Sequence, residues 1–255
     1  MFKIQKILVA TFWVAIAGGM LVLLIAAIGK KNKQHCEDYI IKIKGSQDKF
    51  FIDKNEVLRI LNVATAGKIK GKAIASFNLR AVEELVERDA WIKDAELYFD
   101  NQDILHVTVK EREPIARLFT TGGNSFYIDS SCRRMPLSDK VSAKVPVFTN
   151  FPEKKFMDAK DSTLLYGIKN TAQYIIKNPF WMAQVEQLDI TPQYTFEMVP
   201  TIGNHIVKLG DGNGIDKKFH RLFVFYKEIL SKTGFDKYSV LDAQYEGQLI
   251  ATRKE

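Results

Sequence analysis

Hydrophobic positions are continuous near the start of the chain and periodic in the rest of it. The stretch from Ile7 to Ile28 holds no charged side chain. As a helix it would extend roughly 33 Å, enough to cross a hydrocarbon core of about 30 Å once. A cleaved secretory signal, which Lys3 and Lys6 would also suit, has a shorter apolar core of about 7–15 residues. We therefore predict a short N-terminus over residues 1–6 and a transmembrane signal-anchor helix over residues 7–28.

Alternating and helical patterns after the anchor predict a compact α+β unit. A polar stalk over residues 29–38 leads into a first strand, and Asp53 and Asn78 stand at the capping positions of two helices. Glu56 follows Asp53 by three residues, as in a capping box. Trp91 and Ile92 are expected to end the second helix, and the three strands can form one sheet with both helices on one face. The predicted strands are Tyr39–Lys44, Ala95–Phe99 and Ile104–Lys110; the apolar helix positions are Val57, Leu58, Ile60 and Leu61, then Leu79, Val82, Leu85 and Val86.

The pattern beyond Phe151 predicts a second α+β unit that is richer in strands. A helix with apolar positions between Leu164 and Ile176 is expected to end before Pro179, and a second helix over Asp216–Ser231 is expected to end at Gly234. The fold class is thus α+β: a transmembrane helix, a three-stranded sheet with two helices, and a mainly antiparallel β domain with helices. The predicted strands of that domain are Val185–Ile190, Tyr194–Val199 and His205–Leu209 as a meander, then Tyr238–Tyr245 and Gln248–Arg253, interrupted at Gly247.

Composition and charge narrow the class of partner. With 46% hydrophobic and 26% charged residues the chain is globular, and its formal charge of +7 is dispersed along the sequence. Nucleic-acid binders usually gather basic residues on one face, so solvation or attraction to anionic lipid head groups is the better interpretation. The lysines on the two sides of the anchor are nearly balanced, and charge alone leaves its orientation open.

The residues that usually carry chemistry are scattered. The four histidines (His35, His106, His205 and His220) have no metal-ligand neighbour at zinc spacing, and no nucleophile elbow is present. The glycine-containing basic loop between Ala64 and Ser76 departs from a phosphate-binding loop, and Gly210–Gly214 is best interpreted as a strand-to-helix turn. Cys36 and Cys132 are predicted to be unpaired. We expect no enzyme, no cofactor, no metal, no small-molecule substrate and no nucleic acid.

The last predicted strand is the most informative candidate for binding. A strand at a sheet edge offers unpaired backbone groups, to which a partner's extended segment can add. Tyr245 is a plausible aromatic anchor, and alternation places Leu249 and Ala251 on its face unless Gly247 introduces a bulge. A strand that simply completes the sheet fits the pattern equally well.

Several segments resemble one family. Trp91–Phe99 followed by Ile104–Arg117 resembles the end of a POTRA domain running into its neighbour, and Val107–Ala116 is the most specific piece. The chain as a whole resembles the FtsQ/DivIB family of bacterial division proteins. Further similar segments are Tyr127–Cys132, Val145–Asn150 and Tyr238–Tyr245. The family usually has Gly where Cys132 stands, so this turn departs from the family pattern, and a left-handed conformation there would cost a non-glycine residue roughly 1–2 kcal/mol. The family pattern also has a basic residue near Gln244, so that contact is not carried over to this chain.

The resemblance implies a specific architecture and function. It implies a POTRA domain over residues 39–112, an FtsQ-type β domain over residues 113–255, a cytoplasmic N-terminus and a periplasmic bulk anchored in the inner membrane at the division septum. It also implies a divisome scaffold that binds FtsB- and FtsL-type partners through its C-terminal region, where the edge-strand argument favours strand addition, and that associates with other divisome membrane proteins. The implied contacts are Asp242, Tyr245, Gly247, Leu249 and Ile250.

Two other classes of protein remain as alternatives. One is a POTRA-containing outer-membrane assembly or secretion factor, which the predicted helical anchor makes less suitable. The other is a membrane-anchored cell-wall enzyme, for which activity on peptidoglycan would be the discriminating observation.

Overall fold

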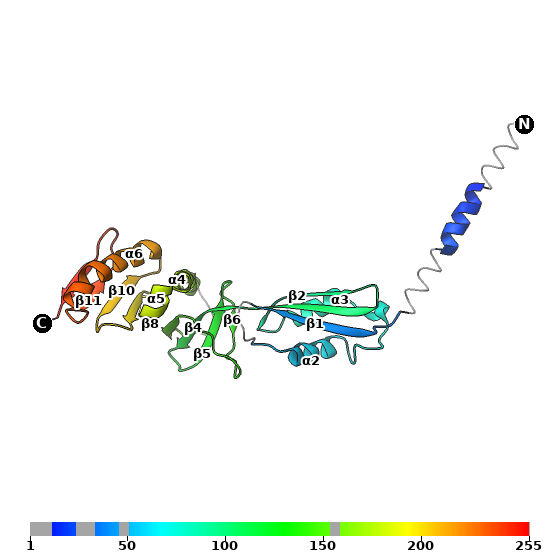
Figure 1. Cartoon of the computed structure of the whole chain (residues 1–255), viewed down its shortest axis with the longest axis horizontal. Coiled ribbons are helices and arrows are strands. Elements are labelled where there is room, and N and C mark those ends of the chain that lie inside the picture. Colours follow the sequence, from blue (N-terminus) through cyan, green and yellow to red (C-terminus); the bar gives the residue numbers. More distant parts are fainter. Residues whose placement is uncertain (1–11, 24–33, 46–50, 154–158, 255) are drawn as a thin grey trace, which may run out of the picture. The chain divides into compact units, whose positions relative to one another are not determined.

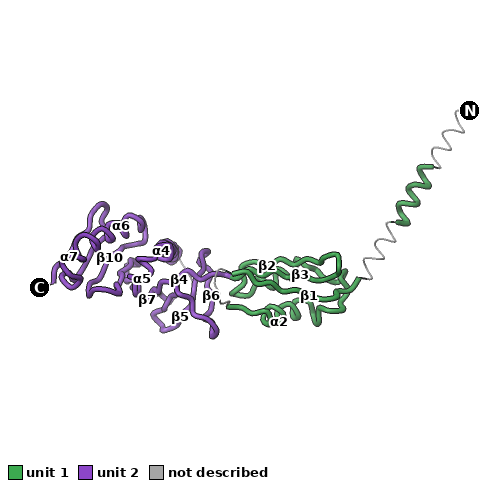
Figure 2. The backbone as a smooth tube through the Cα atoms, viewed as in Figure 1, with its two compact units in different colours: residues 1–111 green, residues 112–255 purple. Residues whose placement is uncertain are grey.

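A computed structural model describes residues 12–23, 34–45, 51–153 and 159–254 of the chain. The chain divides into two compact units, residues 1–111 and residues 112–255 (Figure 2). Each unit has its own sheet, one of three strands and one of nine. The two sheets confirm the α+β class that the sequence predicts.

The anchor predicted over residues 7–28 lies partly outside the described residues, which cover 12–23 of it. Residues 12–23 are helical, with exposed side chains throughout. Among the residues that the structure describes, none belongs to a helix with both the length and the apolar character of a membrane span.

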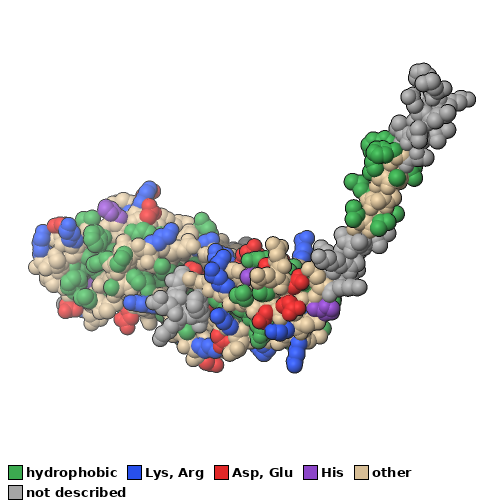
Figure 3. Space-filling view, turned by 45° about the vertical axis from the view of Figure 1, so that its right-hand side comes forward, with side chains coloured by type: hydrophobic (Ala, Val, Ile, Leu, Met, Phe, Trp, Pro, Cys, Tyr) green, Lys and Arg blue, Asp and Glu red, His purple; other side chains and the backbone are tan. Residues whose placement is uncertain are grey.

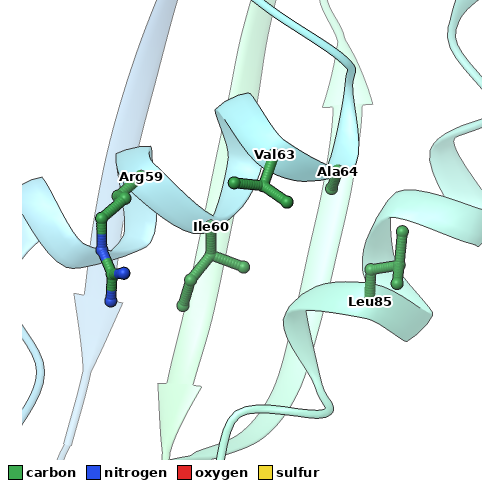
Figure 4. A pocket seen from close by; sticks show the side chains of 5 residues that line it. All are labelled: Arg59, Ile60, Val63, Ala64 and Leu85. Atoms are coloured by element: carbon green, nitrogen blue, oxygen red, sulfur yellow. The ribbon is translucent and has the colours of Figure 1, made fainter.

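The first unit has the predicted order strand, helix, helix, strand, strand. Strand β1 lies parallel to the central strand β3, and β2 lies antiparallel to β3 on its other side. Both helices lie on the same side of this sheet (Figure 4), and the side chains between helices and strands are buried because apolar positions recur at the spacing of each element. The elements are β1 (Asp38–Lys44), α2 (Lys54–Ala64), a 3-10 turn η1 (Ile74–Ser76), α3 (Leu79–Val86), β2 (Ile92–Phe99) and β3 (Ile104–Glu111). The core between them contains Ile41, Val57, Leu61, Val82, Val86, Leu97, Leu105, Val107 and Val109.

The predicted capping box at the start of α2 is confirmed. The Asp53 carboxylate accepts a hydrogen bond from the Glu56 amide at 2.9 Å, and the Glu56 carboxylate accepts one from the Asp53 amide at 2.9 Å. These two bonds satisfy amide groups that have no partner inside the helix.

We expect Asp53→Ala to lower the free energy of unfolding by about 1 kcal/mol, because it removes the cap from the first turn of α2. Urea denaturation of the wild type and the variant measures this difference. Asp53→Ser keeps an acceptor at the same position and serves as the matched control, with a loss of only a few tenths of a kcal/mol. An Asp53→Ala variant as stable as the wild type would show that the cap contributes nothing.

The edge of β2 is closed by side chains from α3 and from Glu87, the residue that follows it. The Leu97 amide donates to the Glu83 carboxylate at 2.7 Å, and the Ala95 amide donates to the Glu87 carboxylate at 3.1 Å. Both amides point away from β3, where a further strand would otherwise pair. The two carboxylates therefore occupy donors that an added strand would need.

The segment between α3 and β2 differs from the prediction. Helix α3 ends at Val86, and Ile92 begins β2 instead of ending the helix. Trp91 is buried, and its ring stacks on Phe51 with centroids 4.1 Å apart. The apolar residues Trp91 and Ile92 are therefore explained by packing of the turn and of β2, and not by a longer α3.

The basic loop before α3 is tied to the segment that precedes β1. The Gly71 amide donates to the Cys36 carbonyl at 2.7 Å, and the Cys36 amide donates to the Lys72 carbonyl at 2.9 Å. Ile69 is buried beneath the loop. Backbone hydrogen bonds and the burial of Ile69 thus tie this loop to the rest of the first unit.

The second unit is built on a nine-stranded mixed sheet with the order β12-β11-β10-β9-β8-β7-β4-β5-β6. Strands β8, β9 and β10 form the predicted antiparallel meander. The pairs β4–β7, β7–β8 and β10–β11 are parallel and the other five are antiparallel. The strands are β4 (Pro114–Thr120), β5 (Ser125–Asp129), β6 (Arg134–Met135), β7 (Val147–Phe151), β8 (Val185–Ile190), β9 (Phe196–Pro200), β10 (Ile206–Gly210), β11 (Tyr238–Asp242) and β12 (Ile250–Arg253).

Helices of the second unit pack on this sheet around one aromatic core (Figure 1). Trp181 is 1% exposed and lies within ring contact of Phe219 at 4.7 Å and Tyr226 at 5.6 Å between centroids. The helices are α4 (Ala159–Lys177), α5 (Pro179–Gln184), α6 (Ile215–Phe225), a π-helical turn η2 (Tyr226–Leu230) and α7 (Ser231–Thr233). Gly234 ends the last helix, as predicted, with φ at 90°.

Helix α5 was not predicted. The sequence predicts that α4 ends before Pro179, and Pro179 also occupies the first turn of the next helix, where a missing N–H costs nothing. The Asn178 side chain caps that helix by accepting from the Phe180 and Trp181 amides. The cap brings Trp181 into the core.

A buried polar pair crosses the core of the second unit. His205 is 3% exposed, and its Nε2 lies 2.7 Å from the Tyr226 hydroxyl. Burial lowers the pKa of His205 below its ordinary value of 6.5, with smaller opposing effects from the Phe235 backbone and Asp236. The folded state therefore holds this imidazole neutral at a pH where the unfolded state begins to bind a proton.

We expect the stability of the second unit to fall as the pH drops below about 6.5, because the unfolded chain then binds a proton that the folded chain does not. The slope contributed by His205 reaches at most about 1.4 kcal/mol per pH unit, between the unfolded pKa and the lower folded one. Urea denaturation at a series of pH values from about 7.5 to about 5, where an imidazole titrates, measures this slope. His205→Gln should flatten the profile, and His220→Gln, at an exposed position, should leave it unchanged. Identical profiles for all three proteins would contradict this expectation.

A buried ion pair lies at the start of the second unit. The Arg112 guanidinium donates to the Asp129 carboxylate at 2.5 Å, and the two side chains are 7% and 5% exposed. Asp129 also accepts from the Ser131 hydroxyl at 2.7 Å and the Arg133 amide at 2.8 Å. Cys132 lies within this turn with φ at 63°, in the left-handed region that favours glycine.

Candidate partner-binding surface

Strand β12 lies at one end of the nine-stranded order and pairs with β11 alone among the described strands. The edge position expected for the last strand is therefore present. Register pairs Ile250 with Asp242 and Ala251 with Leu241. Ile250 is 47% exposed, whereas Ala251 packs against the core.

The backbone of β12 directs specific amides away from the sheet. The Lys254 amide donates to the Lys237 carbonyl at 3.0 Å, toward β11. Amide directions alternate along an extended strand, so the amides of Ala251 and Arg253 point away from β11. These two residues offer the donors to which a further strand would pair.

The predicted strand around Tyr245 was wrong in its extent. Strand β11 ends at Asp242 and β12 begins only at Ile250, so residues 243–249 form the connection between them. Gly247 has φ at 70° within this connection, and the Gln248 amide donates to the Tyr245 carbonyl at 3.4 Å. A turn here breaks the alternation, so Tyr245 does not share the face of Leu249 and Ala251.

The structure brings the five candidate residues into one hairpin with different environments. Asp242 is half-buried, and its carboxylate accepts from the Gln244 amide at 3.0 Å. Tyr245 is 55% exposed in the turn. Leu249 packs against the core, so its contribution is to hold the hairpin down. A Cβ at Gly247 would meet no other atom, so space does not require glycine here. Its left-handed backbone conformation does favour glycine.

Arg221 was missed by the sequence reasoning. From α6 its Nη2 donates to the carbonyl oxygens of Ala243 and Tyr245, each at 3.0 Å. This guanidinium fixes the first half of the connection and so positions Tyr245. The link spans more than twenty residues of sequence, and no local spacing in α6 indicates it.

A second cation lies close to the same connection. Lys218 is buried, and its ammonium lies 3.7 Å from the Asp211 carboxylate. Burial lowers the pKa of Lys218, and the charge of Asp211 opposes that shift. Gly210 has φ at 77°, and the side chains of Gln244 and Lys218 lie against it, which leaves little room for a Cβ.

Groups that could carry catalysis are dispersed over the described residues. His106 lies 2.8 Å from the Asp100 carboxylate on the sheet of the first unit, and its ring stacks on Tyr98. His205 belongs to the core pair with Tyr226. Within the described part of the chain, no three His, Cys, Asp or Glu side chains gather as metal ligands, and both cysteines are free.

Charged side chains of both signs are interspersed on the face of the molecule seen in Figure 3. Basic side chains lie on both units in that view, next to acidic ones. The pattern is that of a solvated surface, and an extended single-sign stripe would be needed for backbone recognition of nucleic acid.

The two units define a class of protein. Residues 34–110 match the family model for a POTRA-like domain, in agreement with the three-stranded unit, and the larger sheet follows it directly. Residues 113–252, more than half of the chain, match the model described as FtsQ/DivIB, C-terminal related. The chain therefore belongs to the FtsQ/DivIB family of cell division proteins, and the resemblance found in the sequence is confirmed.

Individual relatives carry the same description. The chain is 24% identical to the cell division protein FtsQ of Salinibacter ruber over 187 residues, which is 71% of this chain and 72% of the relative. It is 24% identical to the cell division protein FtsQ of Geotalea daltonii over 243 residues, or 90% of this chain and 84% of the relative. A third FtsQ, from a Geobacter species, is 25% identical over 75% of this chain and 69% of the relative.

Proposed function

We propose that this protein is a non-catalytic scaffold of the division machinery, which binds FtsB- and FtsL-type partners by strand addition at β12. The observation that carries the proposal is the open edge of β12, at the end of the nine-stranded sheet. Family membership supports a role in cell division. Main-chain hydrogen bonds to such an edge supply affinity, and alternate side chains supply selectivity.

The proposed contacts are those of the hairpin. An added strand would pair with the amides of Ala251 and Arg253 and lie beside the exposed side chain of Ile250. Tyr245 would contact the partner from the turn, where Arg221 holds its carbonyl. Asp242 and Gly247 would shape the hairpin, and Leu249 would anchor it to the core.

The proposal includes the membrane topology. Residues 7–28 would form the inner-membrane anchor, with residues 1–6 in the cytoplasm and residues 29–38 as a stalk. A POTRA domain over residues 39–112 and a β domain over residues 113–255 would then lie in the periplasm at the septum. The uncharged stretch Ile7–Ile28 supports this arrangement through its length and composition.

The test is a binding titration with the full chain in nanodiscs and with a chain that ends at Tyr245. The periplasmic segments of the FtsB- and FtsL-type proteins from the same bacterium are the titrants. We expect the full chain to bind and the truncated chain to lose binding while it still unfolds cooperatively. Equal binding by both chains would exclude β12 as the site, and no binding by the full chain would contradict the scaffold function.

A further inference from the structure

An open apolar groove lies between α2 and α3 in the POTRA-like unit, on the side of the helices away from the sheet (Figure 4). It has a volume of about 470 Å³. Its lining consists of Arg59, Ile60, Val63, Ala64 and Leu85. One wall comes from one and a half turns of α2, and the other comes from α3.

The groove exposes apolar side chains that do not pack into the core of the unit. Val57 and Leu61 of α2 are fully buried against the sheet. Val63 is 79% exposed and Leu85 is 38% exposed, and Val63 is the most exposed of the large hydrophobic side chains in the described residues. Helix α2 thus has a second apolar surface, formed by Ile60, Val63 and Ala64, with Arg59 beside it. Val63 and Ala64 follow Ile60 by three and four positions, so these residues lie on one side of the helix.

The charges around the groove are unbalanced. Arg59 is the one charged lining residue, and its guanidinium forms no ion pair or hydrogen bond with another of the described residues. The carboxylates of the two helices are engaged elsewhere. Glu56 serves the capping box, Glu83 and Glu87 accept from β2, and Glu84 pairs with Arg80 at 3.5 Å. A ligand for this groove should therefore be apolar with a negative charge at the Arg59 end.

We propose that this groove binds an amphipathic helix of a partner protein, with apolar side chains seated against Val63 and Leu85 and a carboxylate paired with Arg59. This site lies in the first unit and is independent of strand addition at β12. An added helix can rest between two helices and fill the hollow with side chains at i, i+4 and i+7. A strand added at the β2 edge of the same unit would have to displace Glu83 and Glu87 from its amides.

The size of the groove sets the expected affinity. The groove runs along Arg59 to Ala64 of α2, about 9 Å of helix, so a partner helix can contact it over about two turns. Two or three buried apolar side chains, less the cost of association, correspond to a Kd on the order of 10–100 μM. Binding of this strength suits a contact that acts together with a second site.

The test uses the full chain in nanodiscs of neutral lipid and two helical peptides of about 18 residues. Both peptides carry leucines at i, i+4 and i+7; one places Glu beside this stripe and the other places Lys. Methyl NMR at Ile60, Val63 and Leu85 reports the site. We expect the Glu peptide to bind more tightly by about fivefold, as a partly exposed ion pair allows, and to shift these methyl signals.

Charge reversal makes the test specific. Arg59→Glu should reverse the preference, so that the Lys peptide binds more tightly, whereas Arg80→Glu changes the net charge equally on α3 outside the groove and should leave the preference in place. Val63→Asp should weaken the Glu peptide about tenfold, because a buried apolar contact is lost; its exposed position predicts an unchanged melting temperature.

Three outcomes would overturn the proposal. The first is equal binding of the two peptides, and the second is the same response to Arg59→Glu and Arg80→Glu, which would indicate non-specific attraction. The third is a shift of the groove methyl signals by phosphatidylglycerol vesicles with no response to either peptide. That result would assign the groove to a lipid surface.

Discussion

Ala251→Pro is expected to weaken binding of the FtsB- and FtsL-type segments by a factor of roughly 30–100, or about 2–3 kcal/mol. Proline removes the outward amide of Ala251, and its ring occupies the space that the neighbouring strand would take. Each lost main-chain hydrogen bond contributes about 0.5–1.5 kcal/mol, and the displaced strand loses more than one. The pairing of β12 with β11 should persist, because proline is tolerated on edge strands whose N–H faces outward. Titration with the full chain measures the affinity.

Ala251→Ser is the matched control for this prediction. It keeps the backbone amide and a small side chain at the same position, so it should bind almost as well as the wild type. Thermal unfolding of both variants checks that the hairpin is intact. If Ala251→Pro bound like Ala251→Ser with an unchanged melting temperature, the partner would have to bind elsewhere than at the edge of β12.

Asp129→Ala is expected to destabilise the second unit by about 3–5 kcal/mol. It leaves the buried Arg112 guanidinium without the Asp129 carboxylate, and it also removes the acceptor for the Ser131 and Arg133 groups. In urea denaturation, the midpoint should fall by roughly 1–3 M. Asp139→Ala, at an exposed position in the same unit, should remain within about 0.5 kcal/mol of the wild type.

The pH dependence of this effect has a defined sign. Burial alone would raise the pKa of Asp129, but hydrogen bonds from Ser131, Arg112 and Arg133 outweigh burial and lower it below 3.8. The carboxylate therefore contributes stability above the unfolded pKa, and this contribution is lost as the pH falls through the lower folded value. The difference between wild type and Asp129→Ala should shrink below about pH 3.8. A difference that stayed constant would show that the charge of Asp129 is not its source.

Local signals in the sequence were enough to predict most elements of the fold. The capping box at Asp53 and Glu56, the meander of β8 to β10 and the stop at Gly234 all depend on residues close in sequence. These features are decided within a few residues, where spacing and side-chain type have direct structural consequences.

The features that were missed depend on contacts across the fold. Arg221 holds the Ala243 and Tyr245 carbonyls from another element, and no spacing reveals such a link. Tyr245 was placed on a strand because alternation continues past Asp242, while the left-handed Gly247 and the guanidinium of Arg221 favour a turn. Pro179 is compatible both with the end of α4 and with the first turn of a further helix. The burial of Trp181, which only the folded structure shows, favours the further helix α5.

The carboxylates that close β2 affect how the protein behaves at high local concentration. Proteins gathered at one place in a cell meet each other's sheet edges far more often than dilute proteins do, and open edges are the usual start of aggregation. Here Glu83 and Glu87 occupy the β2 amides, and β6, at the far end of the larger sheet, is only two residues long. Neither edge offers a template on which identical copies could stack. The protein can therefore be concentrated without polymerising through these edges.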